Sequence, residues 1–350
     1  MASVKASKIN YKTIIIAVCG LILVGLAIWY FFLRSKEYPG VPRTAVKYYK
    51  EGMDSLDAGR IEAAANLFTK AVDLDHTFAD ACAKLAETYY RASLQHKTNK
   101  NTKMHTAMLD QSKRFMLMAF DAQASNGNAH FVRGLLAFDN KAYDEALRDF
   151  EHAEMYGYKS FELHSMMAYA YNEKEKTALC VEQYQKAIAI KPEDMNTLYN
   201  LGELYFQLGN YNMASDYFSK MVKIDPTHSQ ARINYALSVW KNGNPNLGKS
   251  MINQLLDTDG KTPVNLYNAI AWQLIDKDID IAMGLKLAQA ANGMKPNNVE
   301  SIDILGWGYY KNGEYTKAVE YLSQSMKKMP SDEVKNRLKM AKDKLEESKK

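Results

Sequence analysis

The chain has 350 residues, a formal net charge of +5 and 47% hydrophobic residues. Three N-terminal lysines and residues 333–350 contribute +3 each, which leaves about −1 over residues 34–332, and so neutral a body lacks the basic footprint of a nucleic-acid-binding protein. The three cysteines form no CxxC pair, so neither a disulfide scaffold nor a zinc site is expected.

The first element in chain order is an uncharged segment from Ile14 to Leu33, which follows a basic tail over residues 1–13. At about 1.5 Å per residue, a helix of this length spans the roughly 30 Å hydrocarbon core of a bilayer. Aromatic residues from Trp29 to Phe32 crowd its far end, as is typical of a membrane interface. We therefore expect a retained transmembrane helix. A cleaved signal peptide is the alternative, which the length of the apolar run and the lack of a small-residue cleavage site disfavour.

The orientation of this span is ambiguous, because basic residues flank both of its ends. Three lysines precede it, and four basic residues follow it closely, beginning in a Pro/Gly linker over residues 34–44. A short basic tail usually stays in the cytoplasm. We therefore expect the rest of the chain on the outer side of the membrane, with the cytoplasmic orientation left open.

A 34-residue unit from Met195 to His228 has the pattern of two helices joined by a turn. Gly209-Asn210 interrupts the apolar periodicity, and Asp225-Pro226 ends it, because proline cannot continue a helix. Small residues mark the expected helix crossing, where large side chains of the unit fill the space beside them. The small residues are Gly202 and Ala214; the periodic apolar residues are Leu198, Leu201, Leu204, Tyr205, Tyr211, Phe218 and Met221.

This unit resembles the tetratricopeptide repeat (TPR), whose helix pairs recur about every 34 residues. The resemblance implies an all-α fold, a right-handed superhelical solenoid. Together with the alignment below and the apolar segment at 14–33, the predicted chain has about eight repeats preceded by one transmembrane helix. Eight repeats align on the small and aromatic positions within a solenoid over residues 45–332. They are 45–78, 79–126, 127–160, 161–194, 195–228, 229–262, 263–298 and 299–332.

Three repeats and the C-terminal segment depart from the regular repeat, and the seventh repeat carries two extra residues. The second repeat carries a polar, Lys/Asn-rich insertion at residues 93–106, which is either a disordered loop or a second contact surface. The sixth repeat is degraded, with Pro245 where its second helix should begin and Gly248 in place of alanine. Residues 333–347 predict an amphipathic capping helix within a C-terminal segment 333–350. Its apolar residues are Val334, Leu338, Met340, Ala341 and Leu345.

No motif predicts catalysis, a cofactor or a metal site, so we do not expect an enzyme or a small-molecule substrate. The seven histidines are scattered without an HExxH motif, and we expect them at the surface or at helix ends. The glycines are explained by helix crossings and turns. Cys82 and Cys180 occupy small-residue positions in helices, where a buried free thiol behaves as a compact apolar group.

The resemblance instead implies a groove that binds proteins or peptides, lined by the first helix of each pair. The matching positions are largely apolar and aromatic, with two asparagines that can hydrogen-bond a peptide backbone. Some of these residues, such as Phe206, could instead pack between repeats. The predicted groove residues are Phe131, Phe138, Met166, Tyr169, Tyr199, Asn200, Glu203, Phe206, Ile233, Asn234 and Trp240.

Chaperone-binding members of the family hold a C-terminal carboxylate with a clamp of cationic residues. This chain lacks cationic residues at the corresponding positions, so an acidic chaperone tail should bind poorly. Those positions carry Ser165, Tyr169, Gln230 and Asn234 around Asn200, and Tyr199, Glu203, Leu266 and Ile270 around Asn234.

The last two repeats, over residues 268–322, resemble paired repeats of bacterial envelope TPR proteins tied to exopolysaccharide, lipopolysaccharide or pilus assembly. The resemblance rests on Ala271-Trp272 and on the run from Asp303 to Trp307. It implies an inner-membrane scaffold with its repeats in the periplasm, which organises partner proteins of an envelope complex. A translocon-associated cochaperone for unfolded clients is the alternative, followed by a regulatory subunit of a membrane enzyme.

Overall fold

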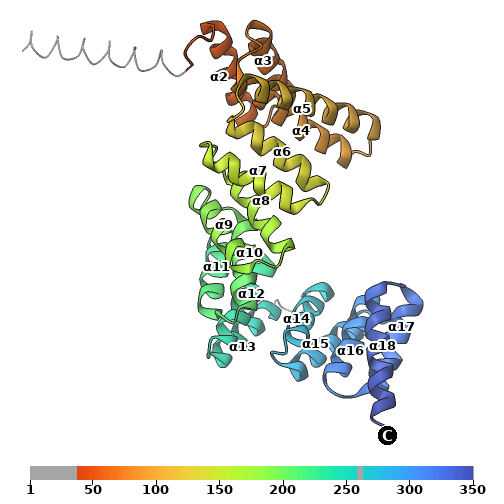
Figure 1. The fold of residues 1–350 in the computed structure, drawn as a ribbon. Helices are drawn as coiled ribbons and strands as arrows, with labels where there is room; N and C mark the ends of the chain where they lie inside the picture. Colours follow the sequence, from red (N-terminus) through yellow and green to blue (C-terminus); the bar gives the residue numbers. More distant parts are fainter. Residues whose placement is uncertain (1–37, 258–262, 350) are drawn as a thin grey trace, which may run out of the picture. The chain divides into compact units, whose positions relative to one another are not determined.

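The computed structural model describes residues 38–257 and 263–349. Seventeen α-helices, α2 to α18, make up these residues, and no strand occurs among them (Figure 1). The prediction of an all-α solenoid of helix pairs is confirmed. The chain divides into two compact units, unit 1 up to Lys159 and unit 2 from Ser160 onward.

Unit 1 consists of three helix pairs, each joined by a short turn. The helices of each pair pack against one another, and both α3 and α6 also pack against α4. The helices are α2 (Arg43–Asp57), α3 (Ile61–Leu74), α4 (Ala79–Thr98), α5 (Thr102–Ala122), α6 (Gly127–Asp139) and α7 (Tyr143–Met155).

Unit 2 consists of five helix pairs and a last single helix, and each helix packs against the next one along the chain. The helices are α8 (Phe161–Glu173), α9 (Thr177–Ile190), α10 (Met195–Gln207), α11 (Tyr211–Ile224), α12 (Ser229–Lys241), α13 (Pro245–Leu256), α14 (Val264–Asp276), α15 (Ile281–Met294), α16 (Val299–Lys311), α17 (Tyr315–Lys328) and α18 (Asp332–Glu347).

The helix crossings have the small residues that the sequence predicts. A Cβ atom built on Gly202 would lie 2.6 Å from the ring of Phe218, which is closer than real atoms approach. Glycine therefore lets α10 and α11 come together, and Phe218 fills the contact with no exposed surface. The same arrangement occurs in unit 1, where the pairs are Gly52 with Phe68 and Gly134 with Phe150.

The sixth helix pair is regular despite its unusual sequence. Pro245 occupies the first turn of α13, where its missing N–H removes no helical hydrogen bond. The close contact is reversed in this pair: the glycine lies on the second helix, and a Cβ on Gly248 would lie 2.6 Å from the Cβ of Trp240. The proline and the glycine are thus compatible with the repeat.

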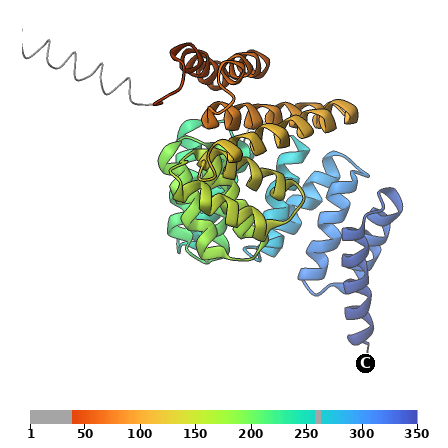
Figure 2. The ribbon, with the colours of Figure 1, turned by 45° about the horizontal axis from the view of Figure 1, so that its top comes forward.

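Apart from a turn at residues 99–101, the insertion at residues 93–106 is helical. Of its two predicted alternatives, the disordered loop is therefore wrong, and the second contact surface stays a prediction. The insertion lengthens α4 to 20 residues and α5 to 21, and these two helices lie alongside each other (Figures 1 and 2). The side chain of Asn101 caps α5 by accepting a hydrogen bond from the backbone N–H of Met104 at 3.2 Å. His105 Nδ1 lies 2.9 Å from the carbonyl oxygen of Ser93, which joins the two helices.

The predicted capping helix is α18, which packs on α16 and α17. Val334 and Ala341 are buried, and Leu338 packs against the same apolar cluster. Met340 is 44% exposed, so its assignment to the apolar face is wrong, because it lies about 160° around the helix from Leu338.

The predicted membrane span at residues 14–33 lies outside the described residues and stays a prediction. Within the described part of the chain, no helix combines the length and the apolar character that crossing a bilayer requires.

Candidate functional site

The predicted groove residues of unit 2 all lie on α8, α10 and α12, which are the first helices of their pairs. We refer to the surface formed by the first helices α8, α10, α12, α14 and α16 as the inner face of unit 2. Donors, acceptors and aromatic rings meet on it at two places.

At the first place, Lys277 brings predicted groove residues together in a polar network. Glu203 accepts hydrogen bonds from Asn234 Nδ2 at 2.7 Å and from Lys277 Nζ at 3.1 Å. The Lys277 ammonium also lies 4.2 Å from the ring centroid of Phe206. Gln230 Nε2 donates to Asn234 Oδ1 at 2.8 Å. Since the side chains of Glu203 and Lys277 are each 19% exposed, the ion pair is shielded but reaches the surface.

Sequence reasoning missed Lys277. It lies directly after α14 and 74 residues beyond Glu203, at none of the positions that carry the family's clamp. Its charge is paired with Glu203, so it adds no free cation for a ligand carboxylate. The expectation that an acidic tail binds poorly therefore remains.

At the second place, Asn200 Nδ2 donates to the Tyr184 hydroxyl at 3.0 Å. Both side chains line a cavity of about 140 Å³ between α8, α9 and α10, together with Asn172 and Gln207. Burial raises the pKa of Tyr184 to about 12. Like any tyrosine hydroxyl it is protonated at neutral pH, so it can donate to a ligand while accepting from Asn200.

The other predicted residues differ in accessibility. Tyr169 is 47% exposed, and Met166, Tyr199 and Trp240 are partly exposed. Burial, followed by the negative charge of Glu203, raises the pKa of Tyr199. These four side chains remain candidates for contact with a partner.

Phe131 and Ile233 were predicted in the groove, but each is only 1% exposed, which corrects their assignment. The Phe131 ring packs between those of Phe150 and Tyr158, with centroids 5.8 and 4.8 Å away. A first helix has both a groove side and a core side, and these residues lie on the core side. Asn234 and Phe206, at 1% and 8% exposure, support the network rather than offer surface.

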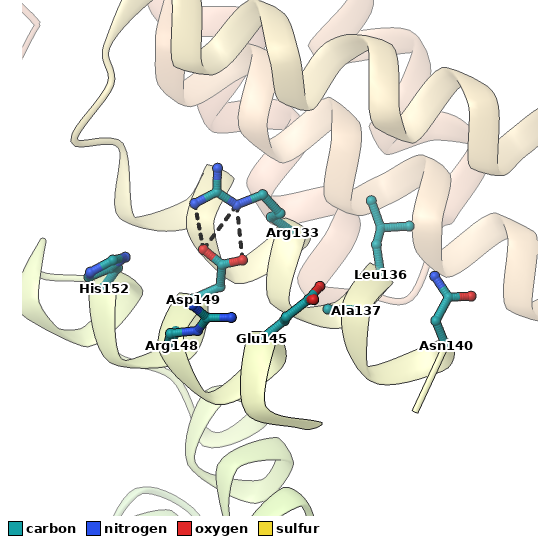
Figure 3. A pocket seen from close by; sticks show the side chains of 8 residues that line it. All are labelled: Arg133, Leu136, Ala137, Asn140, Glu145, Arg148, Asp149 and His152. Carbon is teal, nitrogen blue, oxygen red and sulfur yellow. Dashed lines mark hydrogen bonds and ion pairs between the residues drawn. The ribbon is translucent and has the colours of Figure 1, made fainter. Parts of the chain in front are cut away.

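Unit 1 holds a separate pocket of about 460 Å³ between α6 and α7, shown in Figure 3. Arg133 crosses it and donates three hydrogen bonds of 2.6 to 2.9 Å to both carboxylate oxygens of Asp149. The guanidinium also lies 4.6 Å from the ring centroid of Phe120. Phe138, predicted in the groove, is partly buried and packs edge-on against Tyr143 at 5.4 Å.

The histidines depart in part from the sequence prediction. His228 caps α12 by accepting from the N–H of Ala231, as expected for a helix end. His130 and His164 are instead buried, and His164 Nδ1 lies 2.9 Å from Gln183 Oε1. The contact between His164 and Gln183 joins α8 to α9 within one repeat. Sequence spacing alone does not reveal this contact.

His130 also forms the one group in the described residues with the composition of a metal site, since donor atoms of His130, Asp149 and His152 lie within 4.8 Å of one another. Arg133 argues against such a site. Its Nη2 lies 2.6 Å from Asp149 and 3.2 Å from His130 Nδ1. The guanidinium thus already supplies a positive charge to these acceptors, and it would repel a metal ion placed beside it.

Comparison with known proteins agrees with the helix-pair repeat. A family model described as "Tetratricopeptide repeat" matches residues 196–228, and a second, described as "TPR repeat", matches residues 168–209. Tetratricopeptide repeat protein 6 of Homo sapiens is 36% identical over 58 residues, which cover 17% of this chain and 11% of that protein. The chain thus matches about one-tenth of this relative's length.

Two solved structures are similar at low sequence identity. PilF of Pseudomonas aeruginosa is 17% identical with a TM-score of 0.46, over 62% of this chain and 93% of that one. A tetratricopeptide repeat protein of Parabacteroides merdae is 16% identical with a TM-score of 0.46, over 86% and 99% of the two chains. Similarity at this level says nothing about partners.

Proposed function

Since the chain is built from tetratricopeptide repeats, we propose that it is a protein-binding scaffold that captures partner segments on the inner face of unit 2. The observation that carries the proposal is the gathering of donors, acceptors and aromatic rings there. An extended peptide needs both donors and acceptors for its backbone, and the Asn200 amide offers both. The exposed ring of Tyr169 on the first helix α8 supplies apolar contact area, as aromatic residues commonly do at interfaces.

The Glu203–Lys277 pair supports this role by holding the face in shape. It connects α10 with the end of α14 across the intervening α12, whose Asn234 bonds to the same carboxylate. Rigid elements lose less conformational freedom on binding than flexible ones do. A groove fixed by these contacts is therefore preorganised for a ligand.

We further propose that the scaffold is tethered to a bacterial inner membrane through residues 14–33, with its repeats in the periplasm, and organises partners in an envelope complex. The support is the uncharged, aromatic-ended segment and the resemblance of residues 268–322 to envelope proteins. Tethering raises the effective concentration of a weak binder near membrane partners, so modest affinity is sufficient.

The test is crosslinking of the full chain in native membranes, followed by mass spectrometry of the captured proteins. A scaffold should capture a few defined proteins in fixed ratio, and the double variant Tyr169→Ala/Asn200→Ala should lose them while keeping its circular dichroism and melting temperature. The matched control is Leu179→Ala, which changes a 38% exposed residue on the second helix α9.

Unchanged capture by the double variant would contradict the proposed face. Capture of many unfolded chains without fixed ratio would favour a cochaperone instead, and altered turnover of one captured enzyme would favour a regulatory subunit.

A further inference from the structure

Unit 2 has a second concavity on its inner face, a cavity of about 370 Å³ between α12, α14, α16 and the capping helix α18. Three carboxylates and one guanidinium line it, which gives its wall a formal charge of −2. These charged residues are Glu300, Asp303, Glu333 and Arg337; Trp272 and Gln273 lie beside them. We refer to this cavity as the acceptor pocket.

The contacts of Arg337 show that the walls of the pocket can bind a guanidinium group. Its guanidinium donates to Asp303 Oδ2 at 2.6 Å and lies 4.6 Å from the ring centroid of Trp272 and 5.5 Å from that of Trp307. It also pairs with Glu333. A carboxylate beside a tryptophan ring is a favourable environment for a planar cation, which stacks on the ring and donates in its own plane.

Arg337 does not satisfy all the hydrogen-bond acceptors beside the pocket. Asp303 Oδ1 and Gln273 Oε1 are buried and have no hydrogen-bond partner among the described residues. A buried acceptor without a donor costs free energy, and most such groups in native proteins are satisfied. Burial raises the pKa of Asp303 against the opposing effect of the Arg337 guanidinium, and the nearby Glu333 carboxylate raises it further.

These observations restrict the class of ligand. The two unsatisfied oxygens have no exposed surface of their own, so a donor reaches them only when the lining side chains move. The three carboxylates that line the pocket favour a positive ligand that donates hydrogen bonds. A metal ion fits poorly, because the donor atoms of these carboxylates do not form a group close enough together to hold one among the described residues. An arginine side chain has five donors on a flat, weakly hydrated cation, so it fits better than lysine.

We propose that the acceptor pocket binds an arginine side chain of a protein partner. Gln230 connects it with the rest of the inner face, because this residue lines the pocket and also donates to Asn234 of the polar network. A peptide held near Asn200 and Tyr169 and extended along the first helices would therefore reach the pocket. The inference rests on the proposed function and adds the chemistry of the partner to it.

The test uses the full chain in detergent micelles, with nitrogen-15 labels on its tryptophans, of which the sequence has four. The probes are blocked nine-residue Gly/Ser peptides with a central arginine, lysine or citrulline. Citrulline keeps the shape of arginine but removes its charge. Titration is followed through the indole N–H signals of Trp272 and Trp307, assigned by substitution, up to about 10 mM peptide, the range of weak single-residue recognition.

The arginine peptide should shift both signals, and the citrulline peptide should bind at least about tenfold more weakly. Asp303→Asn and Gln273→Leu should each weaken arginine binding by a similar factor. Glu320→Gln is the matched control, because it removes one exposed carboxylate from the second helix α17 of the same repeat, and it should bind as wild type does.

Equal affinity for arginine and citrulline, unaltered binding by Asp303→Asn, or no shift at the highest concentration would overturn the proposal. The crosslinking assay separates this failure from failure of the proposed function. If Tyr169→Ala/Asn200→Ala loses its partners while Asp303→Asn keeps them, the scaffold role stands and the arginine pocket does not. If neither variant loses them, both proposals fail.

Discussion

Two arginines, one in each unit, make similar contacts with different results. Arg133 of unit 1 and Arg337 of unit 2 each donate to a carboxylate and lie 4.6 Å from the ring centroid of an aromatic residue. Arg133 engages both oxygens of Asp149. Arg337 engages one oxygen of Asp303 and leaves the other buried without a partner.

This difference separates a structural ion pair from a candidate site. In unit 1 the hydrogen-bonding capacity of the carboxylate is used within the pair, so the contact stabilises the crossing of α6 and α7. In unit 2 the carboxylate retains an acceptor that only a further donor can satisfy. An arginine beside a carboxylate and an aromatic ring therefore does not by itself indicate a binding site. A hydrogen-bond acceptor that the arginine leaves without a partner is the stronger indication.

The largest expected effects come from the packing that both units share. Phe150→Ala in unit 1 and Phe218→Ala in unit 2 each remove a fully buried ring that lies against a glycine. Each should reduce the free energy of unfolding by about 3 to 5 kcal/mol through cavity formation. Chemical denaturation, followed by circular dichroism, measures the change. A neutral result at either position would show that the crossings of the two units are not equivalent.

The second prediction concerns the two carboxylates. Asp149→Asn weakens three charge-assisted hydrogen bonds, and because the Arg133 side chain is 46% exposed, we expect a loss of only about 1 to 3 kcal/mol. Asp303→Asn should cost less than about 1 kcal/mol, or even stabilise, because it removes a desolvated charge. Denaturation of both variants beside Glu320→Gln tests this order. If Asp303→Asn lost more unfolding free energy than Asp149→Asn, the proposed difference between the two carboxylates would be wrong.

The smallest expected effect concerns how Glu87 and Asp303 change the free energy of unfolding with pH. Burial favours neutral Glu87 of unit 1, but the Lys84 and Arg91 cations outweigh burial and lower its pKa. Glu87 therefore contributes stability above its usual pKa, and this contribution is lost as pH falls through the lowered value. Burial raises the pKa of Asp303, so its carboxylate costs stability at neutral pH, and protonation relieves that cost as pH falls through the raised value.

Unfolding of Glu87→Gln and Asp303→Asn between pH 7 and about 3 tests these opposite signs. The free energy of unfolding of Glu87→Gln should be lower than that of wild type at pH 7, and this difference should shrink on acidification. Asp303→Asn should instead lose relative stability on acidification. Parallel pH profiles for the two variants would contradict the proposed difference between the two units.

The repeat pattern was predictable because it depends on neighbours along the chain. Gly202 and Phe218 fall in one 34-residue unit, and their spacing alone places them at a helix crossing. The disordered-loop alternative for residues 93–106 was wrong, because Asn, Lys and Thr side chains are typical of loops, whereas Asn101 here acts as a helix cap.

The candidate site was less predictable, because its contacts depend on how successive pairs stack. Lys277 meets Glu203 across 74 residues, and periodicity within one repeat cannot show such a contact. Phe131 and Ile233 were misplaced for the related reason that an apolar residue on a first helix has the same sequence signature on the groove side and on the core side.

The most direct test of the central claim, that partners bind the inner face of unit 2, is site-specific photo-crosslinking in cells that naturally contain the protein. A photoreactive residue replaces Ala269, which lines the acceptor pocket, or Leu247, which is 55% exposed on the second helix α13. We predict that position 269 captures a defined partner through an arginine-containing segment and that position 247 does not. Capture from position 247 alone, or equal capture from both positions, would contradict the account.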